Sequence, residues 1–432
     1  MRYLKPIILT LTAILFLGQA HAAAEKRDSL IVSLLTAWPG SEVYELCGHS
    51  AIRIHSEAMD STWNYGLFDY LEPNFVYRFV KGETDYMVGG FPTSLFLGEY
   101  IMKGRKVLEQ DLNLTQDEAW KLLGLLRTES LPQNRVYRYN YVKDNCATRI
   151  TDRLGQALGQ RIIFPDAIAY GTFRDEMRYF HRDYPWYQFG RDIALGSGLD
   201  YRLKPDEEMF VPVVMSERYS GARLPDGRRL VSGERELVAD SGHASLPPTP
   251  WYLTPLFVSC AALLFIVLAC AWMIWKKRLS RWLYTLWFLI LGVAGCVVAF
   301  LVFESSHEAT SPNMLILWLN PLQIILALSI WFRRAKWLTT SMCWYNIIVL
   351  GVTMIVWPFQ AQSANPAFFP LMGATFLLAL SYAIMIPYIS YNKKNRGKHE
   401  QDSGHGTGRA GRSERSTTRT GRKAPSRGGN RR

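Results

Sequence analysis

The distribution of hydrophobic and polar positions divides the chain near residue 250. Before that point apolar and polar residues alternate over short stretches, whereas five long apolar runs without a charged residue follow it. Each run is close to the roughly 20 residues that a helix needs to cross a bilayer. The pattern therefore predicts an all-α transmembrane domain of five helices within residues 253–391. The runs cover residues 253–275, 282–303, 314–332, 341–359 and 366–389.

The loops between the five runs give this domain an orientation. Basic residues occupy the first and third loops, whereas the second and fourth loops contain no lysine or arginine. Because basic loops stay on the cytoplasmic side of a membrane, the N-terminal half is expected outside and the C-terminal end inside. The residues concerned are Lys276, Lys277, Arg278 and Arg281 in the first loop, and Arg333, Arg334 and Lys336 in the third.

The N-terminus carries the features of a secretory signal peptide. Arg2 and Lys5 precede a short apolar run over residues 7–17, and an A-x-A-like cleavage site ends at Ala22. An uncleaved anchor helix is the alternative, but the run is short for a membrane span. We therefore expect residues 1–23 to be a cleaved signal peptide. Export of the N-terminal half then implies a multi-pass membrane protein whose N-terminal domain lies outside the membrane, in agreement with the orientation that the basic loops predict.

Residues 24–245 show the mixed pattern of an α+β domain. Amphipathic periodicity predicts a helix over residues 115–129, with Thr115 as N-cap and Glu118 completing a capping box, and a second helix over residues 147–158. Residues 173–215 have a helical, aromatic-rich pattern. Short stretches rich in β-branched and aromatic residues predict strands over residues 29–36, 51–55, 61–66, 83–88, 106–114 and 135–142.

The formal net charge of +12 first suggests nucleic acid as a partner, but the charge is unevenly distributed. Residues 24–250 carry 27 basic and 32 acidic side chains, whereas residues 392–432 carry 13 basic and 3 acidic ones. The excess thus reflects membrane topology and argues against a nucleic-acid partner. Residues 392–432 contain few apolar residues and are expected to form a disordered basic cytoplasmic tail. The prolines in residues 246–252 indicate a stiff linker between the domains.

The candidate chemistry of the exported domain centres on Cys146 and His49. No P-loop, dinucleotide-binding glycine motif, CxxC pair or zinc-binding HExxH occurs, so the sequence predicts no metal and no cofactor. Cys146 stands at the start of a predicted helix, where the helix dipole lowers the pKa of a thiol. His49 follows a glycine at the start of a strand and is the candidate base. Asn64 on the next strand is the best candidate for orienting the imidazole, with His55 and Asp69 behind it.

Two features of the exported domain leave other readings open. Cys47 and Cys146 are its only cysteines, and in an oxidising compartment two cysteines often form a structural disulfide. The remaining histidines, His181 and His243, have the sequence surroundings of surface residues. The residues alone are therefore compatible with a thiol site or with a domain stapled by Cys47–Cys146.

Five segments of the exported domain are distinctive in their residues and in their order and spacing along the chain. Residues 34–54 read LLTAWPGSEVYELCGHSAIRI, and the later segments are NYGLFDY at 64–70, DNCATRIT at 144–151, FGRDIALG at 189–196 and EEMFVP at 207–212. Together they resemble the Lnb family of bacterial lipoprotein N-acyltransferases. The pairing of GHSAIR with a later NC is the most specific part of this resemblance. The five apolar runs are similar to the membrane part of the same family.

The resemblance implies a fold and a set of site residues. The exported domain resembles a circularly permuted papain-like fold, of the NlpC and lecithin:retinol acyltransferase type, in which the histidine precedes the cysteine. By position, Cys146 matches the nucleophile and His49 the base. Asn64 matches the orienting residue only through its place on the neighbouring strand. Cys47 departs from the family pattern, which leaves a disulfide with Cys146 open.

The resemblance also implies an activity. A membrane-bound N-acyltransferase of this kind moves an acyl chain from a phospholipid, through a thioester on Cys146, to the N-terminal amine of a diacylglyceryl-cysteine lipoprotein. The membrane, a phospholipid donor and a lipoprotein acceptor are then its partners. The resemblance also implies a multi-pass protein of the bacterial inner membrane, with the catalytic domain in the periplasm and the C-terminal tail in the cytoplasm. Two alternatives remain at this point. One is a papain-like cell-wall peptidase or amidase, and the other is a non-enzymatic membrane sensor or accessory protein with a disulfide-stapled exported domain.

Overall fold

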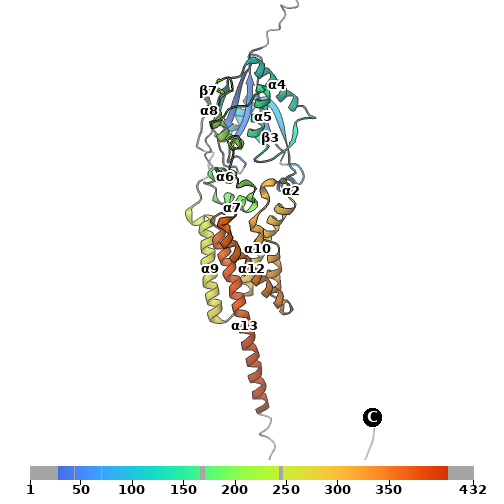
Figure 1. Ribbon diagram of the computed structural model, residues 1–432, viewed down its shortest axis with the longest axis vertical. Helices are drawn as coiled ribbons and strands as arrows, with labels where there is room; N and C mark the ends of the chain where they lie inside the picture. The colour runs from blue at the N-terminus through green and yellow to red at the C-terminus, as the bar shows by residue number, and fades with distance from the viewer. Residues whose placement is uncertain (1–27, 43, 70, 166–170, 243–246, 407–432) are drawn as a thin grey trace, which may run out of the picture.

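The computed structural model describes residues 28–42, 44–69, 71–165, 171–242 and 247–406 (Figure 1). A domain containing a β-sheet stands on one end of a helical bundle, and the last helix projects from the other end. The predicted organisation, an α+β domain followed by an all-α membrane domain, is confirmed. The expected signal peptide lies outside the described residues.

Among its described residues, the N-terminal domain is built on a seven-stranded antiparallel sheet of order β6-β4-β3-β2-β1-β5-β7. The central strand β1 (Ile31–Ala37) is almost wholly buried, because helices cover both faces of the sheet. Helices α4 (Gln116–Glu129) and α5 (Cys146–Leu158) pack on one face, and α3 (Thr93–Lys103) packs on the other. The remaining strands are β2 (His49–His55), β3 (Asp60–Leu67), β4 (Asp85–Pro92), β5 (Val107–Leu112), β6 (Val136–Arg138) and β7 (Val231–Val238).

The helices predicted from local signals begin close to the expected residues. The Thr115 hydroxyl accepts from the N–H of Glu118, and the Glu118 carboxylate accepts from the N–H of Thr115, so the predicted capping box of α4 is present. Asn145 and Thr148 form an equivalent capping box at the start of α5. Because the cap is Asn145, α5 begins at Cys146, one residue before the predicted start.

Residues 173–215 do not form the continuous helical stretch that their pattern suggests. The chain divides into α6 (Phe173–Phe180), α7 (Pro185–Ala194), two 3-10 turns (Ser197–Leu199 and Glu208–Phe210) and α8 (Pro212–Gly221). Prolines stand at the first position of both α7 and α8, where the missing N–H leaves no intrahelical bond unmade. Proline therefore starts new helices here and interrupts the expected one.

Four helices of the described chain are long and apolar enough to cross a membrane. They are α9 (Pro255–Lys276), α10 (Arg281–Phe303), the segment containing α12 (Lys336–Val356), and the first part of α13 (Phe368–Gly406). The third predicted span, residues 314–332, is not a continuous helix. It consists of a 3-10 turn (Met314–Leu317) followed by the two-turn helix α11 (Leu322–Ser329).

The break in this third segment falls at Asn320 and Pro321. Proline has no N–H for a helical hydrogen bond and disfavours the helical conformation of the residue before it. The Asn320 side-chain amide donates to the carbonyls of Ile316 and Leu317, at 3.1 Å each, and its oxygen accepts from the N–H of Leu322. The backbone groups freed by the break are thus satisfied within the protein, as an apolar surrounding requires.

The broken segment still runs the length of the bundle beside α10. At the end nearest the sheet domain, the Asn313 side chain donates to the carbonyl of Ile193. At the far end, the Trp331 ring meets Trp282 edge-on at 4.9 Å. In between, α10 approaches so closely that a Cβ at Gly295 would lie 2.4 Å from the Asn320 backbone. The segment therefore extends from the end of the bundle nearest the sheet domain to the far end without forming one long helix.

The last helix, α13, is longer than expected. It continues to Gly406, whereas the tail is predicted to begin at residue 392. Elongation of an existing helix needs only one residue to be ordered for each new hydrogen bond, and no proline stands between Pro387 and Gly406 to stop it. The rest of the expected tail, residues 407–432, lies outside the described residues.

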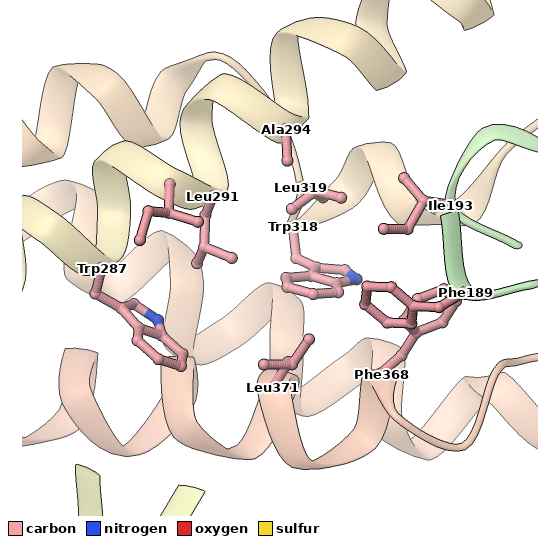
Figure 2. A pocket seen from close by; sticks show the side chains of 10 residues that line it. Phe189, Ile193, Trp287, Leu291, Ala294, Trp318, Leu319, Phe368 and Leu371 are labelled. Atoms are coloured by element: carbon pink, nitrogen blue, oxygen red, sulfur yellow. The ribbon is translucent and has the colours of Figure 1, made fainter. Parts of the chain in front are cut away.

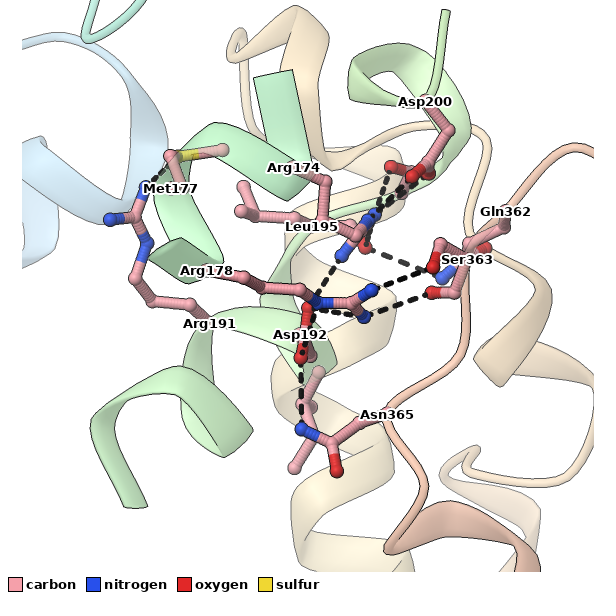
Figure 3. A network of polar contacts seen from close by, with 12 residues as sticks. Arg174, Met177, Arg178, Arg191, Asp192, Leu195, Asp200, Gln362, Ser363 and Asn365 are labelled. Carbon is pink, nitrogen blue, oxygen red and sulfur yellow. Dashed lines mark hydrogen bonds and ion pairs between the residues drawn. The ribbon is translucent and has the colours of Figure 1, made fainter. Parts of the chain in front are cut away.

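Several parts of the sheet domain rest on the membrane bundle. The short helix α2 (Phe75–Lys81) lies against the end of α10, where the rings of Tyr77 and Phe300 are 5.8 Å apart. On the other side, α6 and α7 contact the loop before α13 through polar side chains, which we call the junction network (Figure 3).

Asp192 of α7 lies at the centre of the junction network. Its carboxylate accepts from Arg174 at 2.9 Å, from Arg178 at 3.1 Å, and from the Asn365 side-chain amide at 2.9 Å. Arg178 also donates to the Ser363 hydroxyl at 2.6 Å. Because Asp192 and Arg174 are almost fully buried, these charges stabilise each other away from water, and they fix α7 on the membrane domain.

Candidate active site

The start of α5 holds Cys146 in a defined position. The Asn145 side-chain oxygen accepts from the N–H groups of Ala147 and Thr148, at 2.9 and 3.0 Å. The amide nitrogen of the same side chain donates to the carbonyls of Tyr141 and Phe210, at 2.8 Å each. Asn145 thus ties the first turn of the helix to two other segments, and the half-buried Cys146 side chain follows from the first helical position.

His49 opens strand β2 and lies beside Cys146. The preceding Gly48 has φ +79°, and a Cβ at this position would lie 2.6 Å from the carbonyl oxygen of Ala37. Only glycine tolerates this conformation and this approach, which together set the direction in which the strand begins. The Asn64 Oδ1 atom of β3 lies 2.5 Å from Nε2 of His49. Since Nε2 donates to this oxygen, Nδ1 is the ring nitrogen left to accept a proton.

The two reserve candidates for the orienting position do not reach the imidazole. His55 stands at the other end of β2, six residues from His49, which is about 20 Å along an extended strand. The Asp69 carboxylate accepts from the N–H of Leu71 in an exposed turn. Among the three candidates, Asn64 alone contacts His49.

The Cys146 thiol and the His49 imidazole line the same cavity and lie close enough for each to shift the pKa of the other. Burial by itself raises the pKa of Cys146, but the charge and hydrogen bond of His49 act against it. The N–H groups of Ser50 and Ala147 add to this effect, and the net pKa of the thiol is lowered. Proton transfer from the thiol to the imidazole is therefore favoured at this site.

The pKa of His49 shifts in the matching direction. Burial lowers it, but the charge of Cys146 and hydrogen bonds with Cys146 and Asn64 outweigh burial and raise it. The shift has a simple physical reason, because a thiolate beside the ring favours the protonated imidazole and the oxygen of Asn64 accepts its second N–H. The three side chains thus correspond to a nucleophile, a base that contacts it, and a group that orients the base.

A cavity of about 120 Å³ opens onto the cysteine–histidine pair. Its walls are rich in aromatic rings and come from the turn before β2, from β3 and β4, and from the segments on either side of the Cys146 helix. The lining residues are Tyr44, Cys47, Gly48, His49, Gly66, Phe68, Tyr86, Tyr139, Tyr141, Asn145, Cys146, Phe210, Val211 and Pro212.

Cys47 and Cys146 line the same cavity as free thiols, so the disulfide considered from the sequence is absent between these two described residues. The Cys47 sulfur lies 3.3 Å from the Tyr141 hydroxyl and 3.8 Å from Nε2 of His181. Burial raises the pKa of Cys47, although its hydrogen bond to Tyr141 lowers it in part. The two thiols thus differ in chemistry, since the pKa of Cys146 is lowered and that of Cys47 is raised.

Two family models match this chain. Residues 19–167 match the Lnb N-terminal periplasmic domain, and residues 248–394 match the Lnb transmembrane domain. The chain belongs to the Lnb family of lipoprotein N-acyltransferases. Comparisons with curated proteins and with solved structures gave no significant match. In keeping with the family, the sheet domain is periplasmic and the helical domain places the protein in the inner membrane with several passes.

The periplasmic domain of this Lnb protein contains a second polar cluster that the sequence did not reveal. His181 was expected on the surface but is 2% exposed, and burial together with the charge of Arg191 lowers its pKa to about 2. The Arg191 guanidinium lies 3.1 Å from Nε2 of His181 and 3.2 Å from the Tyr141 hydroxyl. Tyr141 in turn reaches Cys47.

This cluster escapes sequence reasoning for a physical reason. Its residues come from segments far apart in the chain, namely Cys47, Tyr141, His181 and Arg191, and no regular spacing connects them. Arg191 belongs to the segment FGRDIALG, which was noted only for its resemblance to the family. The other remaining histidine, His243, lies outside the described residues. The described part of the chain contains no group of three or more His, Cys, Asp or Glu side chains placed to hold a metal ion.

Proposed function

We propose that this Lnb protein transfers an acyl chain from a phospholipid to the N-terminal amine of a lipoprotein, with Cys146 as the nucleophile. The observation that carries the proposal is the contact of Cys146 with His49 and of His49 with Asn64, in a protein of the lipoprotein N-acyltransferase family. In this scheme Nδ1 of His49 accepts the thiol proton, and Asn64 keeps the ring in position.

The reaction has two steps. In the first, the Cys146 thiolate attacks the ester carbonyl of the phospholipid and forms a C–S bond. The lysophospholipid alkoxide leaves and takes the proton from the His49 imidazolium. In the second, the α-amine of the lipoprotein's diacylglyceryl-cysteine attacks the thioester and gives a proton to His49. The C–S bond breaks, the thiolate returns, and the lipoprotein carries an amide-linked third acyl chain.

The start of α5 supports the negatively charged intermediate of each step. The N–H groups of Ala147 and Thr148 already donate to the Asn145 side chain. Within the first turn of α5, the N–H of Cys146 itself therefore remains the donor best placed for the oxyanion. The positive end of the helix dipole adds to this stabilisation.

The membrane arrangement suits substrates that both carry acyl chains. With the sheet domain in the periplasm, five passes place the last segment of the chain in the cytoplasm, where its basic residues are favoured. In this proposal the broken apolar segment over residues 314–329 is the third pass, in addition to the four helices that are long enough to cross. The active site then stands above the outer surface of the inner membrane, where phospholipids and immature lipoproteins both reside. A soluble peptidase substrate would require no such anchor.

Mass spectrometry of lipoprotein N-termini tests the proposal directly. In cells that depend on this protein for N-acylation, Cys146→Ala and His49→Ala should leave lipoproteins diacylated. Cys260→Ala, which removes an exposed cysteine of α9, should leave them triacylated. Full triacylation in both site variants would overturn the proposal. With purified protein and phospholipid but no lipoprotein, an acyl mass increment on the Cys146 peptide is expected, and a peptidase would not give it.

A further inference from the structure

Helix α7 presents two different faces to the two domains. Residues four apart lie on the same side of a helix, and residues two apart lie on nearly opposite sides. Phe189 and Ile193 form one face and pack on the core of the membrane domain. Tyr187 and Arg191 form the other, where Arg191 bonds to Tyr141 of the active-site wall. The helix therefore separates an apolar region below from a polar region above.

Below α7 lies a cavity of about 190 Å³ with an almost entirely apolar lining (Figure 2). Phe189 and Ile193 project into it from α7, towards Trp318 and Phe368 of the membrane domain. Ile290 of α10 stands at its edge and is 67% exposed on the outer surface of the bundle. An apolar cavity of this size does not attract water, and Ile290 extends its lining to the exposed surface of the bundle. Such a space fits a hydrocarbon chain.

Above α7, Arg191 has unusual partners for an arginine that is largely enclosed. It contacts the Tyr141 hydroxyl, the His181 ring and the Met177 sulfur, and it stacks over the Tyr141 ring at 4.6 Å. Within the described chain it forms no ion pair with a carboxylate. The neighbouring Asp192 does not compensate it, because that carboxylate is bound to Arg174, Arg178 and Asn365. A largely buried cation without an anion is costly, and a bound anion relieves that cost.

We propose that α7 is the binding site of one phospholipid, with its phosphate against Arg191 and one acyl chain in the cavity of Phe189, Trp318 and Phe368. The planar guanidinium suits phosphate oxygens, and the two faces of the helix match the two parts of the lipid. A diacylglyceryl lipoprotein has acyl chains but no phosphate, so the cation selects the donor rather than the acceptor. The identity of this lipid as acyl donor rests on the proposed function.

The experiment measures lipid binding to the full-length Cys146→Ala protein in detergent by native mass spectrometry. The probes are dioleoyl phosphatidylglycerol and dioleoylglycerol, which share their chains but differ in the phosphate. Arg191→Gln should weaken phosphatidylglycerol binding about tenfold and leave dioleoylglycerol binding unchanged, since one charged contact to the phosphate is lost. Arg191→Lys should retain most of the affinity. Inorganic phosphate at millimolar concentration should not displace the lipid, because the chain supplies much of the binding.

A pair of neighbouring substitutions on α10 tests the cavity. Ala294→Phe fills it and should weaken the binding of both lipids, whereas Val293→Phe, on the exposed side of the same turn, should change neither. Equal affinities in Ala294→Phe and wild type would overturn the chain site, and an equal loss of both lipids in Arg191→Gln would overturn the phosphate contact. These measurements need no catalysis. If lipid binds as expected while the Cys146→Ala cells still make triacylated lipoproteins, the lipid site stands and the proposed reaction fails.

Discussion

Asn64 of β3 is a diagonal neighbour of His49 on the adjacent strand β2, and its side-chain oxygen lies 2.5 Å from Nε2 of the imidazole. The register of strands β2 and β3 pairs Asn64 with Ala51, two residues after His49 and on the same face of the sheet. Diagonal neighbours of this kind are close enough for polar side chains to meet. A shift of the register by one residue would turn Asn64 to the opposite face and separate the two groups.

Removal of this contact should lower the rate without unfolding the protein. In Asn64→Ala the imidazole loses the acceptor that orients it and stabilises its charged form. We expect kcat for N-acylation to fall by about tenfold to a hundredfold, the value of one hydrogen bond to a charged group. Asp69→Asn, in the exposed turn after β3, is the control and should keep the full rate. An unchanged kcat in Asn64→Ala would show that Asn64 does not orient the base.

The ionisation of Cys146 can be followed through its alkylation by iodoacetamide at different pH values, read from the mass of its peptide. Because His49 and nearby N–H groups lower the pKa of this thiol, its reaction should reach half-maximal rate at a lower pH than that of an ordinary cysteine. In His49→Ala only the burial and the N–H groups remain, so the midpoint should move to higher pH.

Cys47 provides an internal comparison in the same experiment. Burial raises its pKa, so its half-maximal alkylation should occur at a higher pH than that of Cys146 in the same cavity. Replacement of His49 should move the Cys47 midpoint much less than that of Cys146, because burial dominates the Cys47 pKa and the charge of Cys146 contributes least to it. Equal midpoints for the two thiols, or a Cys146 midpoint that ignores the loss of His49, would contradict the thiolate–imidazolium pair.

Glu176 of α6 should make the protein less stable as pH rises. Burial and the nearby Glu208 raise its pKa to about 9, and neither carboxylate oxygen has a hydrogen-bond partner among the described residues. Between its unfolded-state pKa of about 4.3 and this value, the folded protein holds a proton that the unfolded chain releases. The contribution of the Glu176 proton to the free energy of unfolding is therefore fully present below about pH 4, and it is lost progressively as pH rises towards 9.

Glu176→Gln removes this titration while keeping the shape of the side chain. Its melting temperature should equal that of the wild type near pH 4 and exceed it increasingly up to pH 8.5, as measured by thermal unfolding in detergent. Asp175→Asn, the exposed neighbour, should show no such trend. A constant difference between Glu176→Gln and wild type across this range would indicate that the carboxyl does not stay protonated.

The junction network should contribute strongly to the stability of the whole molecule. Asp192→Ala removes one of the two buried carboxylates that bind Arg174 and leaves Asp200 as the other, and it also removes the acceptor shared by Arg178 and Asn365. The loss of one member of a buried pair costs about 3–5 kcal/mol, and the remaining Asp200 contact places the expected loss towards the lower end of that range. Thermal unfolding of the full chain should show this loss. Asp226→Ala, which breaks an exposed ion pair with Arg228, serves as the control and should have little effect. A similarly small effect of Asp192→Ala would show that the network does not hold the domains together.

Much of this protein follows from its sequence because the signals are local. The capping residues Thr115 and Asn145 act within one helical turn, and they place the start of α4 and of the Cys146 helix. Strand alternation and apolar run length likewise depend on neighbouring residues, so an α+β domain followed by an all-α membrane domain was predicted, and four of the five apolar runs lie in long apolar helices. His49, Asn64 and Cys146 were singled out by such signals and by resemblance to the family.

The tertiary structure decided what depends on contacts between distant segments. The strand register brings Asn64 to His49 and leaves His55 at the far end of β2, a choice that local patterns do not encode. The third apolar run is interrupted at Pro321, and the interruption is tolerated because the Asn320 side chain satisfies backbone groups beside it and α10 packs closely against it. The environment of Arg191 exists only once α7 is docked between the two domains. Docking buries charged residues whose partners are distant in the sequence, so no sequence spacing predicts which charges will pair.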